Sequence, residues 1–294
     1  MKKVIIFGGC GFLGSWITKI LLQENYKITI FDLNINKNLL NIIAKNNIDK
    51  VKFVEGDITN LAQVENVLRK ADHVINLAGL MTPDCSFNPI LGAKVNILGS
   101  INVFEAAKKY NIKFIVYASS AGVFGINDKL IPFPETHYGA YKLAIEGVAR
   151  AYFNENHISS FGIRPYVLYG PGREVGGTAG VTLACKAAKQ GIKFTIDFVG
   201  RAGFVYVEDV ANLVKMYLKN SLKGAITVNI NGISKDVREI VSIIKKNIPV
   251  AKIGFNDKPL SVVDEIIGDE PYKYFKEFKY TTLQDGIKKT IDFY

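Results

Sequence analysis

The stretch "KVIIFGGCGFLG", residues 3–14, decides the fold of this 294-residue chain. It opens with a lysine and the apolar run "VIIF", which is typical of a strand buried on both faces. Gly8, Gly11 and Gly14 then recur at every third residue, where the strand would turn into a helix over residues 12–24. Glycines let the backbone approach a pyrophosphate at a helix N-terminus, whose N–H groups are unpaired. The triplet alone could mark a tight turn, but its place between a strand and a helix favours a nucleotide site.

Apolar runs alternate with helical patterns through the first half of the chain. The further runs are "YKITIFD", "VKFVEGD", "DHVINLAG", "KFIVYASS" and "SSFGIRP". Between them lie segments with helical spacing, such as "LAQVENVLRKA" and "GAYKLAIEGVARAYFNEN". This alternation predicts an α/β fold, a Rossmann-type doubly wound parallel sheet.

The regular alternation weakens after "RPYVLYGPGREVGG", which suggests a second unit. We expect an NAD-binding Rossmann domain over residues 1–165, with returning segments near 200–230. A small C-terminal substrate-binding lobe would occupy residues 166–294, mainly 170–200 and 232–282. The ending "TTLQDGIKKTIDFY" predicts a closing helix with a Ser/Thr-type cap.

Composition narrows the class of protein. Hydrophobic residues make up 48% and charged residues 22% of the chain, as in ordinary folded proteins. The net charge of +10 comes from lysines scattered singly and in pairs, without an aromatic-interleaved basic block, so we expect no nucleic-acid partner. Three widely spaced cysteines predict neither a disulfide framework nor a metal site. The same cysteine usage predicts a reducing, cytoplasmic location, and with no apolar run of 18 residues we expect no membrane association.

Carboxylates and small residues end the next strands, where a dinucleotide would lie. Asp32 ends the second strand, 18 residues past Gly14, and could accept both hydroxyls of an adenosine ribose. Its charge would repel a 2′-phosphate, which favours NAD over NADP. Asp57 and Ile58 could hold the adenine ring, although ordinary loop chemistry would give the same residues. The fourth strand ends in small residues that could pass beside the phosphates, Leu77, Ala78 and Gly79.

One helical segment carries Tyr138, Lys142 and Glu146 at four-residue steps, which places them on one face. Lowering a tyrosine pKa by about three units costs ~4 kcal/mol. An ammonium ~4 Å away supplies about that much at an effective dielectric near 20. Tyr138 is therefore predicted to be a base with Lys142 as its pKa shifter, whereas Glu146 is expected to be a solvated or helix-pairing carboxylate. Ser120 could hydrogen-bond the substrate oxygen.

In these motifs the chain resembles the extended short-chain dehydrogenase/reductase branch, the NAD-dependent epimerase/dehydratase family. The resemblance is carried, in order, by "GGCGFLG", "FDL", "GDIT", "NLAG", "KVNILGSINVFEAA", "SSAGVFG", "YGAYK", "IRPYVLYGPG", "FVYVEDVA" and "TTLQDGIKKTI". It implies bound NAD and hydride transfer at a carbinol carbon, with no metal. It also implies catalytic roles for Ser120, Tyr138 and Lys142.

The resemblance implies further cofactor contacts along the same motifs. Phe12 and Leu13 belong to the glycine turn, and Asn96 would lie near the nicotinamide. Pro165 and Val167 would pass beside that ring. In relatives, the helices matching "VNILGSINVFEAAKKY" and "YKLAIEGVARAYF" form a dimer, so a homodimer is expected.

Two departures bear on the substrate. Val167 stands where nucleotide-sugar members have an asparagine, and Ala202 stands where they have an arginine. Predicted substrate contacts are Ser120, Arg173, Thr178, Arg201 and Tyr206, although either arginine could equally be a solvated surface residue.

Three functions therefore remain open. The first is a nucleotide-sugar epimerase that keeps its NAD throughout the reaction. The second is an NAD-dependent dehydrogenase of a free sugar, uronate or other small hydroxy substrate. The third, a non-catalytic NAD-binding sensor, is disfavoured because the tyrosine, lysine and serine are all present.

Overall fold

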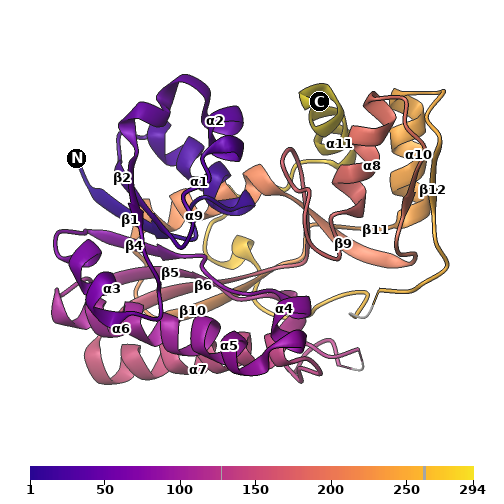
Figure 1. The fold of residues 1–294 in the computed structure, drawn as a ribbon. Coiled ribbons are helices and arrows are strands. Elements are labelled where there is room, and N and C mark those ends of the chain that lie inside the picture. The colour runs from indigo at the N-terminus through magenta and orange to yellow at the C-terminus, as the bar shows by residue number, and fades with distance from the viewer. Residues whose placement is uncertain (127, 261–262) are drawn as a thin grey trace.

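A seven-stranded parallel sheet forms the centre of the computed structural model, which describes residues 1–126, 128–260 and 263–294 (Figure 1). The strand order is β10-β6-β5-β4-β1-β2-β3, and the strands pair in parallel. The strands are β1 (Lys3–Phe7), β2 (Lys27–Asp32), β3 (Lys52–Glu55), β4 (His73–Asn76), β5 (Phe114–Ala118), β6 (Ser159–Pro165) and β10 (Ala225–Ile230). The order reverses between β1 and β4, which opens a crevice at the carboxyl ends of these strands. The predicted Rossmann-type sheet is confirmed.

Helices cover both faces of this sheet because its strands are apolar on both sides. In β1, Val4 and Ile6 enter one buried cluster, whereas Ile5 and Phe7 enter the other. Three helices lie on the first face: α1 (Phe12–Gln23), α2 (Asn38–Ala44) and α9 (Val207–Asn220). The second face carries α3 (Leu61–Leu68), α6 (Gly99–Lys109) and α7 (His137–Asn156) (Figure 1). Every strand residue of β1 beyond Lys3 is therefore withdrawn from water.

Shorter helical segments complete this part of the chain. They are α4 (Thr82–Phe87), α5 (Pro89–Ala93), the π-helix η2 (Lys94–Leu98) and the 3-10 helices η1 (Lys45–Lys50), η3 (Ala121–Val123) and η4 (Pro271–Lys273). The stretch Pro89–Lys109 is one helical run, long and apolar enough by length and composition to cross a membrane. In the sequence its apolar character is less plain, because Lys94 and Glu105 interrupt it. Its inward residues, among them Val103 and Phe104, pack in the core beneath the sheet.

The C-terminal part of the chain builds a smaller lobe. Its strands are β7 (Val167–Tyr169), β8 (Phe194–Ile196), β9 (Arg201–Tyr206), β11 (Ile233–Asp236) and β12 (Ile253–Phe255). They form a three-stranded sheet, β11-β9-β7, and a two-stranded sheet, β12-β8. The helices α8 (Gly180–Lys189), α10 (Val237–Asn247) and α11 (Leu283–Phe293) pack beside them (Figure 1). As the sequence predicts, α11 begins with a threonine cap, since the Thr282 hydroxyl accepts a hydrogen bond from the Asp285 N–H (3.2 Å).

The chain crosses between the two units more than once. Within the predicted returning segment 200–230, α9 and β10 rejoin the large sheet, but β9 pairs with β7 and β11 in the small one. Residues 261–262, inside the predicted lobe segment 232–282, lie outside the described residues. The domain boundary at residue 165 stays a prediction.

His73 gives the folded protein a pH-dependent stability. The imidazole is 3% exposed, lies between the rings of Tyr26 and Phe114, and neither ring nitrogen has a hydrogen-bond partner among the described residues. Burial lowers the pKa of His73 to about 4 from its usual 6.5. Between these values the unfolded chain binds a proton that the folded chain does not, so stability falls as pH drops below 6.5.

We expect the free energy of unfolding to fall by about 2 kcal/mol between pH 7.5 and pH 5 because of His73. Urea denaturation at pH 7.5, 6 and 5 measures the change. The variant His73→Leu should lose most of this dependence, whereas His137→Gln, at an exposed histidine, should keep it. An equal pH dependence in wild type and His73→Leu would contradict the assignment.

Candidate active site

The glycine turn between β1 and α1 is shaped by close backbone contacts. Gly8 has a φ of +71°, and a Cβ there would lie 2.8 Å from the Ala78 backbone nitrogen. A Cβ on Gly14 would lie 2.6 Å from the Gly9 Cα, so α1 can start this close to the strand only with glycine. Within the described residues, no side chain caps the N-terminus of α1 at Gly11, and no acidic residue occupies its first turn. The free N–H groups and the positive end of the helix dipole suit a pyrophosphate.

Asp32 lies at the end of β2, directly beside this turn. Its Oδ2 accepts a hydrogen bond from the Cys10 N–H (3.0 Å), which fixes the carboxylate next to the glycines. Asp57 follows β3, and its Oδ1 accepts from the Thr59 N–H (2.8 Å). Ile58 is buried, and a Cβ on Gly99 would lie 2.8 Å from its side chain. Asp32 therefore keeps an oxygen for a ligand, whereas Asp57 mainly shapes its own turn.

Leu77, Ala78 and Gly79 follow β4, and Gly79 faces the side chains of Asn96 and Lys142. The Asn96 Nδ2 donates to the backbone oxygens of Leu80 (3.2 Å) and Gly92 (3.0 Å). Its Oδ1 is buried without a hydrogen-bond partner in the part of the chain that the structure describes, and a Cβ on Gly79 would lie 2.5 Å from it. The same Cβ would lie 3.3 Å from the Lys142 Nζ. Because Gly79 has no side chain, a space lined by the polar groups of Asn96 and Lys142 stays open between β4 and the helices.

These features fit a bound dinucleotide. The first turn of α1, directly after the glycines, offers uncapped N–H groups to phosphates, Asp32 offers an acceptor to a ribose, and the Asn96 Oδ1 is available to a donor at the other end of the crevice. The residues therefore suit NAD in the order that the sequence predicts. The individual contacts of Phe12, Leu13 and Pro165 with a cofactor stay predictions.

Helix α7 brings Tyr138 next to Ser120. The Thr136 hydroxyl caps the helix by accepting from the Gly139 N–H (3.0 Å), and Gly139 packs on the Gly122 carbonyl. The Ser120 Oγ accepts from the Gly122 N–H (3.0 Å), which anchors the serine at the end of β5. A Cβ on Gly122 would lie 3.3 Å from that Oγ and 3.7 Å from the Tyr138 ring. Serine and phenol thus share one small space.

Lys142 lies one turn along α7 and is buried at 7% exposure. Its Nζ donates to the Ala118 carbonyl (2.8 Å) and lies 5.6 Å from the centroid of the Tyr138 ring. Burial lowers the pKa of Lys142 to about 8. The predicted proximity of lysine and tyrosine is present, with the ammonium turned toward the backbone.

The expected lowering of the Tyr138 pKa by Lys142 is not seen. Burial raises the pKa of Tyr138, while a hydrogen bond from the Ser120 hydroxyl and the charge of Arg173 lower it. From helical spacing alone, Lys142 is expected to lower the pKa of Tyr138. It does not reveal that Tyr138 and Lys142 are both desolvated, which favours the neutral form of each.

Glu146 is not the solvated or helix-pairing carboxylate that its spacing predicts. It is 8% exposed and accepts two hydrogen bonds from Arg164, Nε to Oε1 (2.7 Å) and Nη2 to Oε2 (2.5 Å). Ser119, next to Ser120, also donates to its Oε1. The cause is the packing of α7 on the sheet, which turns this helix face inward against β6. Glu146 has no direct place in the chemistry but ties the catalytic helix to β5 and β6.

The structure separates the predicted substrate residues. Arg173 lies in the loop between β7 and α8, with its guanidinium 5.7 Å above the Phe12 ring, and Thr178 follows in the same loop. Arg201 is exposed at the start of β9, where its Nη1 contacts the Ser234 carbonyl (3.4 Å). Among the described contacts, none joins Arg201 to Arg173 or Phe12. Arg173 is the arginine that reaches the crevice.

Tyr206 is a core residue, so its prediction as a substrate contact is wrong. It is 2% exposed and packs against the rings of Trp16 and Tyr169. The strand β9 directs this side chain under the sheet, where α1 covers it. Val167, predicted beside the nicotinamide, is also buried (2% exposed) and pairs with Phe204, and its contact with a cofactor stays a prediction.

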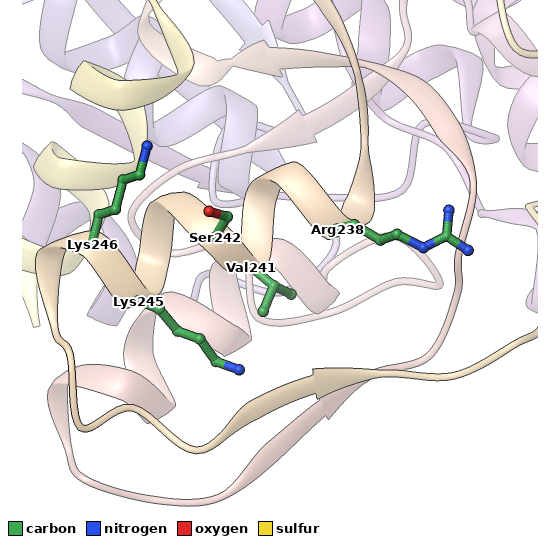
Figure 2. Close-up of a pocket in the computed structure, with 5 residues that line it drawn as sticks. All are labelled: Arg238, Val241, Ser242, Lys245 and Lys246. Carbon is green, nitrogen blue, oxygen red and sulfur yellow. The ribbon is translucent and has the colours of Figure 1, made fainter.

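A hollow of about 400 Å³ lies elsewhere, on the surface of α10 (Figure 2). Its lining consists of Arg238, Val241, Ser242, Lys245 and Lys246. None of these is a predicted site residue, and the hollow is not part of the crevice.

Asp32 is expected to set the preference for NAD. The variant Asp32→Asn removes the charge but keeps an acceptor for the Cys10 N–H. A charge-assisted hydrogen bond is worth about 1.5–3 kcal/mol, so the Kd for NAD should rise at least about tenfold while the Kd for NADP does not rise. Isothermal titration of both nucleotides measures the ratio, with Asp49→Ala, at an exposed carboxylate on η1, as the control. An unchanged ratio in Asp32→Asn would remove Asp32 from ribose recognition.

Comparison with known proteins supports this geometry. The model of the NAD dependent epimerase/dehydratase family matches residues 4–231. A putative UDP-glucose 4-epimerase of Methanocaldococcus jannaschii is 30% identical, covering 98% of this chain and 97% of its own. The UDP-glucose 4-epimerase of Thermus thermophilus, solved in complex with NAD, aligns with a TM-score of 0.83 at 24% identity, over 99% of this chain and 98% of that one.

The UDP-N-acetylglucosamine 4-epimerase of Methanobrevibacter ruminantium M1 aligns with a TM-score of 0.86 at 22% identity, over 99% of this chain and 97% of that one. Both structural likenesses confirm the fold over the full length. The family model covers the stretch that holds the glycine turn, Asp32, Tyr138 and Lys142, and the archaeal relative matches nearly the whole chain. The chain therefore belongs to the NAD-dependent epimerase/dehydratase family of enzymes, with NAD as its cofactor.

Proposed function

We propose that this enzyme transfers hydride at a secondary alcohol of a nucleotide-sugar and acts as an epimerase. The observation that carries the proposal is the shared space of Ser120 and Tyr138, with Lys142 beside them, at the edge that also holds the glycine turn. The 30% identity with a putative UDP-glucose 4-epimerase over nearly the whole chain supports the choice of substrate class.

Each residue has a role that follows from its position. NAD, when bound, supplies the acceptor of the hydride and can return it. Tyr138 takes the proton of the carbinol hydroxyl, and Ser120 hydrogen-bonds the same substrate oxygen. The Lys142 Nζ lies 5.6 Å from the centroid of the Tyr138 ring, so an ammonium there would favour a phenolate formed during the reaction, while Ser120 and Arg173 lower the pKa of the resting phenol.

The net reaction depends on where the hydride goes next. Return to the opposite face of the same carbon, with the Tyr138 proton given back to the oxygen, inverts that centre. Loss of reduced cofactor would make the enzyme a dehydrogenase instead. The proton held by Tyr138 serves either outcome.

A dehydrogenase of a free sugar, uronate or other small hydroxy substrate is the second candidate. Two buried apolar residues favour the dehydrogenase. By resemblance to the nucleotide-sugar members of the family, an asparagine is expected at position 167 and an arginine at position 202, but this chain has Val167 and Ala202 there. Neither side chain can donate a hydrogen bond to a diphosphate. A smaller substrate would not need these donors.

The homodimer and the cytoplasmic location are also proposals. Large apolar side chains are exposed on α4, α5 and η2: Phe87 (92%), Ile90 (72%), Leu91 (45%) and Leu98 (52%). Such a patch on neighbouring helical turns supports an interface with a second copy. The three cysteines are free, which supports a reducing compartment.

Epimerase and dehydrogenase differ in what the purified protein releases and produces. We expect denatured protein to release NAD, and the folded protein to interconvert UDP-sugars without accumulating NADH. Tyr138→Phe should lower turnover at least about 100-fold, because general acid–base catalysis is worth that much, while NAD binding persists. Tyr141→Phe, on the same helix with its hydroxyl bonded to the Pro89 carbonyl (2.9 Å), is the matched control.

Chromatographic separation of the sugars and absorbance at the NADH band measure both quantities. Steady NADH formation without interconversion would favour the dehydrogenase. Full activity of Tyr138→Phe would remove Tyr138 from the mechanism.

The dimer is tested by light scattering after size-exclusion chromatography. We expect wild type at twice the mass of the chain and Ile90→Asp at the mass of the monomer, since a charge in an apolar interface is costly. Val250→Asp, at an exposed residue (83%) after α10, should remain dimeric. A wild-type monomer would contradict the proposal.

A further inference from the structure

Arg173 is a cationic residue in the crevice that forms no ion pair with another residue in the part of the chain that the structure describes. In the part of the chain that the structure describes, its Nε is buried with no hydrogen-bond partner and its guanidinium takes part in no ion pair. Two other arginines are paired, since Arg164 binds Glu146 and Arg238 binds Asp236. Arg173 as a whole is half-buried, and withdrawing part of an unpaired charge from water is unfavourable. A ligand that supplies the missing anion would offset this cost.

The loop that carries Arg173 is built to turn it inward. Gly176 has a φ of +104°, and a Cβ there would lie 2.9 Å from the Arg173 Nη2, so glycine both permits the turn and leaves room for the guanidinium. The Arg173 N–H donates to the Gly170 carbonyl (3.1 Å), and the Gly172 N–H donates to the Tyr294 hydroxyl (3.1 Å). The loop is thus anchored both to itself and to the C-terminus of the chain.

The guanidinium lies at the reacting end of the crevice. It is stacked 5.7 Å above the Phe12 ring, and its charge acts directly on Tyr138, whose pKa it lowers. Burial lowers the pKa of Arg173 itself. Arg173, placed by its contact with Phe12, therefore adds positive charge to the crevice in which Lys142 lies 5.6 Å from the centroid of the Tyr138 ring.

The carboxylate next to Arg173 in the chain is engaged by other groups. Glu174 accepts a hydrogen bond from the Lys186 Nζ (2.8 Å) and another from the Tyr294 hydroxyl (3.1 Å). The anion that Arg173 would pair with must then come from a ligand. A planar guanidinium binds a carboxylate through two parallel hydrogen bonds, which a neutral hydroxymethyl group cannot match.

We propose that Arg173 binds a carboxylate that the substrate carries close to the carbinol deprotonated by Tyr138, so that the enzyme selects a sugar acid over the neutral sugar. This inference rests on the proposed hydride transfer at Tyr138. It fits both candidate functions, because a uronic acid linked to a nucleotide and a free uronate or hydroxy acid carry the same group. The diphosphate of NAD is the competing partner, since Phe12 belongs to the glycine turn.

The test uses substrates that differ only in this group. UDP-glucuronic acid and UDP-glucose form one pair, and glucuronate and glucose form the other. For the pair that is turned over, kcat/KM for the acid should exceed that for the neutral sugar at least about 100-fold, the usual effect of one buried charge pair. Arg173→Gln should reduce this preference to about fivefold or less, with the loss confined to the acid, and Arg173→Lys should restore part of it.

Two further measurements separate the alternatives. Isothermal titration should give the same Kd for NAD in wild type and Arg173→Gln, and it should show the same acid preference for ligand binding to the NAD complex. Arg69→Gln, at an exposed arginine after α3, should behave as wild type in all assays.

Three results would overturn the proposal, and a fourth would leave the decision to the binding measurement. A wild type that prefers the neutral sugars, or an Arg173→Gln variant that loses acid and neutral substrates equally, excludes the carboxylate contact. A weaker Kd for NAD in Arg173→Gln assigns Arg173 to the cofactor diphosphate. If none of the four compounds is turned over, the proposed function fails, and the binding preference alone then decides the role of Arg173.

Discussion

The buried ion pair between Glu146 and Arg164 is the contact on which the site depends. Glu146 lies on α7, two turns from Tyr138, and Arg164 lies on β6. Ser119 at the end of β5 donates to the same carboxylate, and the Arg164 Nη1 donates to the Asn229 Oδ1 (3.1 Å) on β10. One pair of charges thus fixes α7, the helix that carries Tyr138 and Lys142, against three strands. Removing either partner would leave a charge buried without compensation.

The electrostatics of the crevice follow from this placement. Because α7 is held tightly on the sheet, Tyr138 and Lys142 are withdrawn from water, and each is pushed toward its neutral form. Ser120 and Arg173 act in the opposite direction on the phenol. The reactivity of Tyr138 is therefore set by a balance between desolvation and several neighbours, rather than by one lysine alone.

The smaller lobe contributes one side chain, Arg173, to the charges that act on the pKa of Tyr138. The loop after β7 carries Arg173 to the Phe12 ring, while the positions that resemblance assigns to diphosphate donors hold the buried Val167 and Ala202. The lobe thus provides a cation near the reacting atoms and apolar side chains at those two positions.

Local sequence patterns were enough to predict the features that depend only on residues close together in the chain. The glycine turn, the carboxylate of Asp32 and the helical spacing of Tyr138 and Lys142 follow from backbone geometry and helix periodicity, and the model confirms the elements that carry them. Only the tertiary structure decided which faces are buried. Glu146 became an ion-pair partner and Tyr206 a core residue because α7 and β9 pack with those faces inward. Arg173 reaches Phe12 from a distant part of the chain, and no local pattern fixes such a contact, because burial and charge pairing depend on what the fold places opposite each side chain.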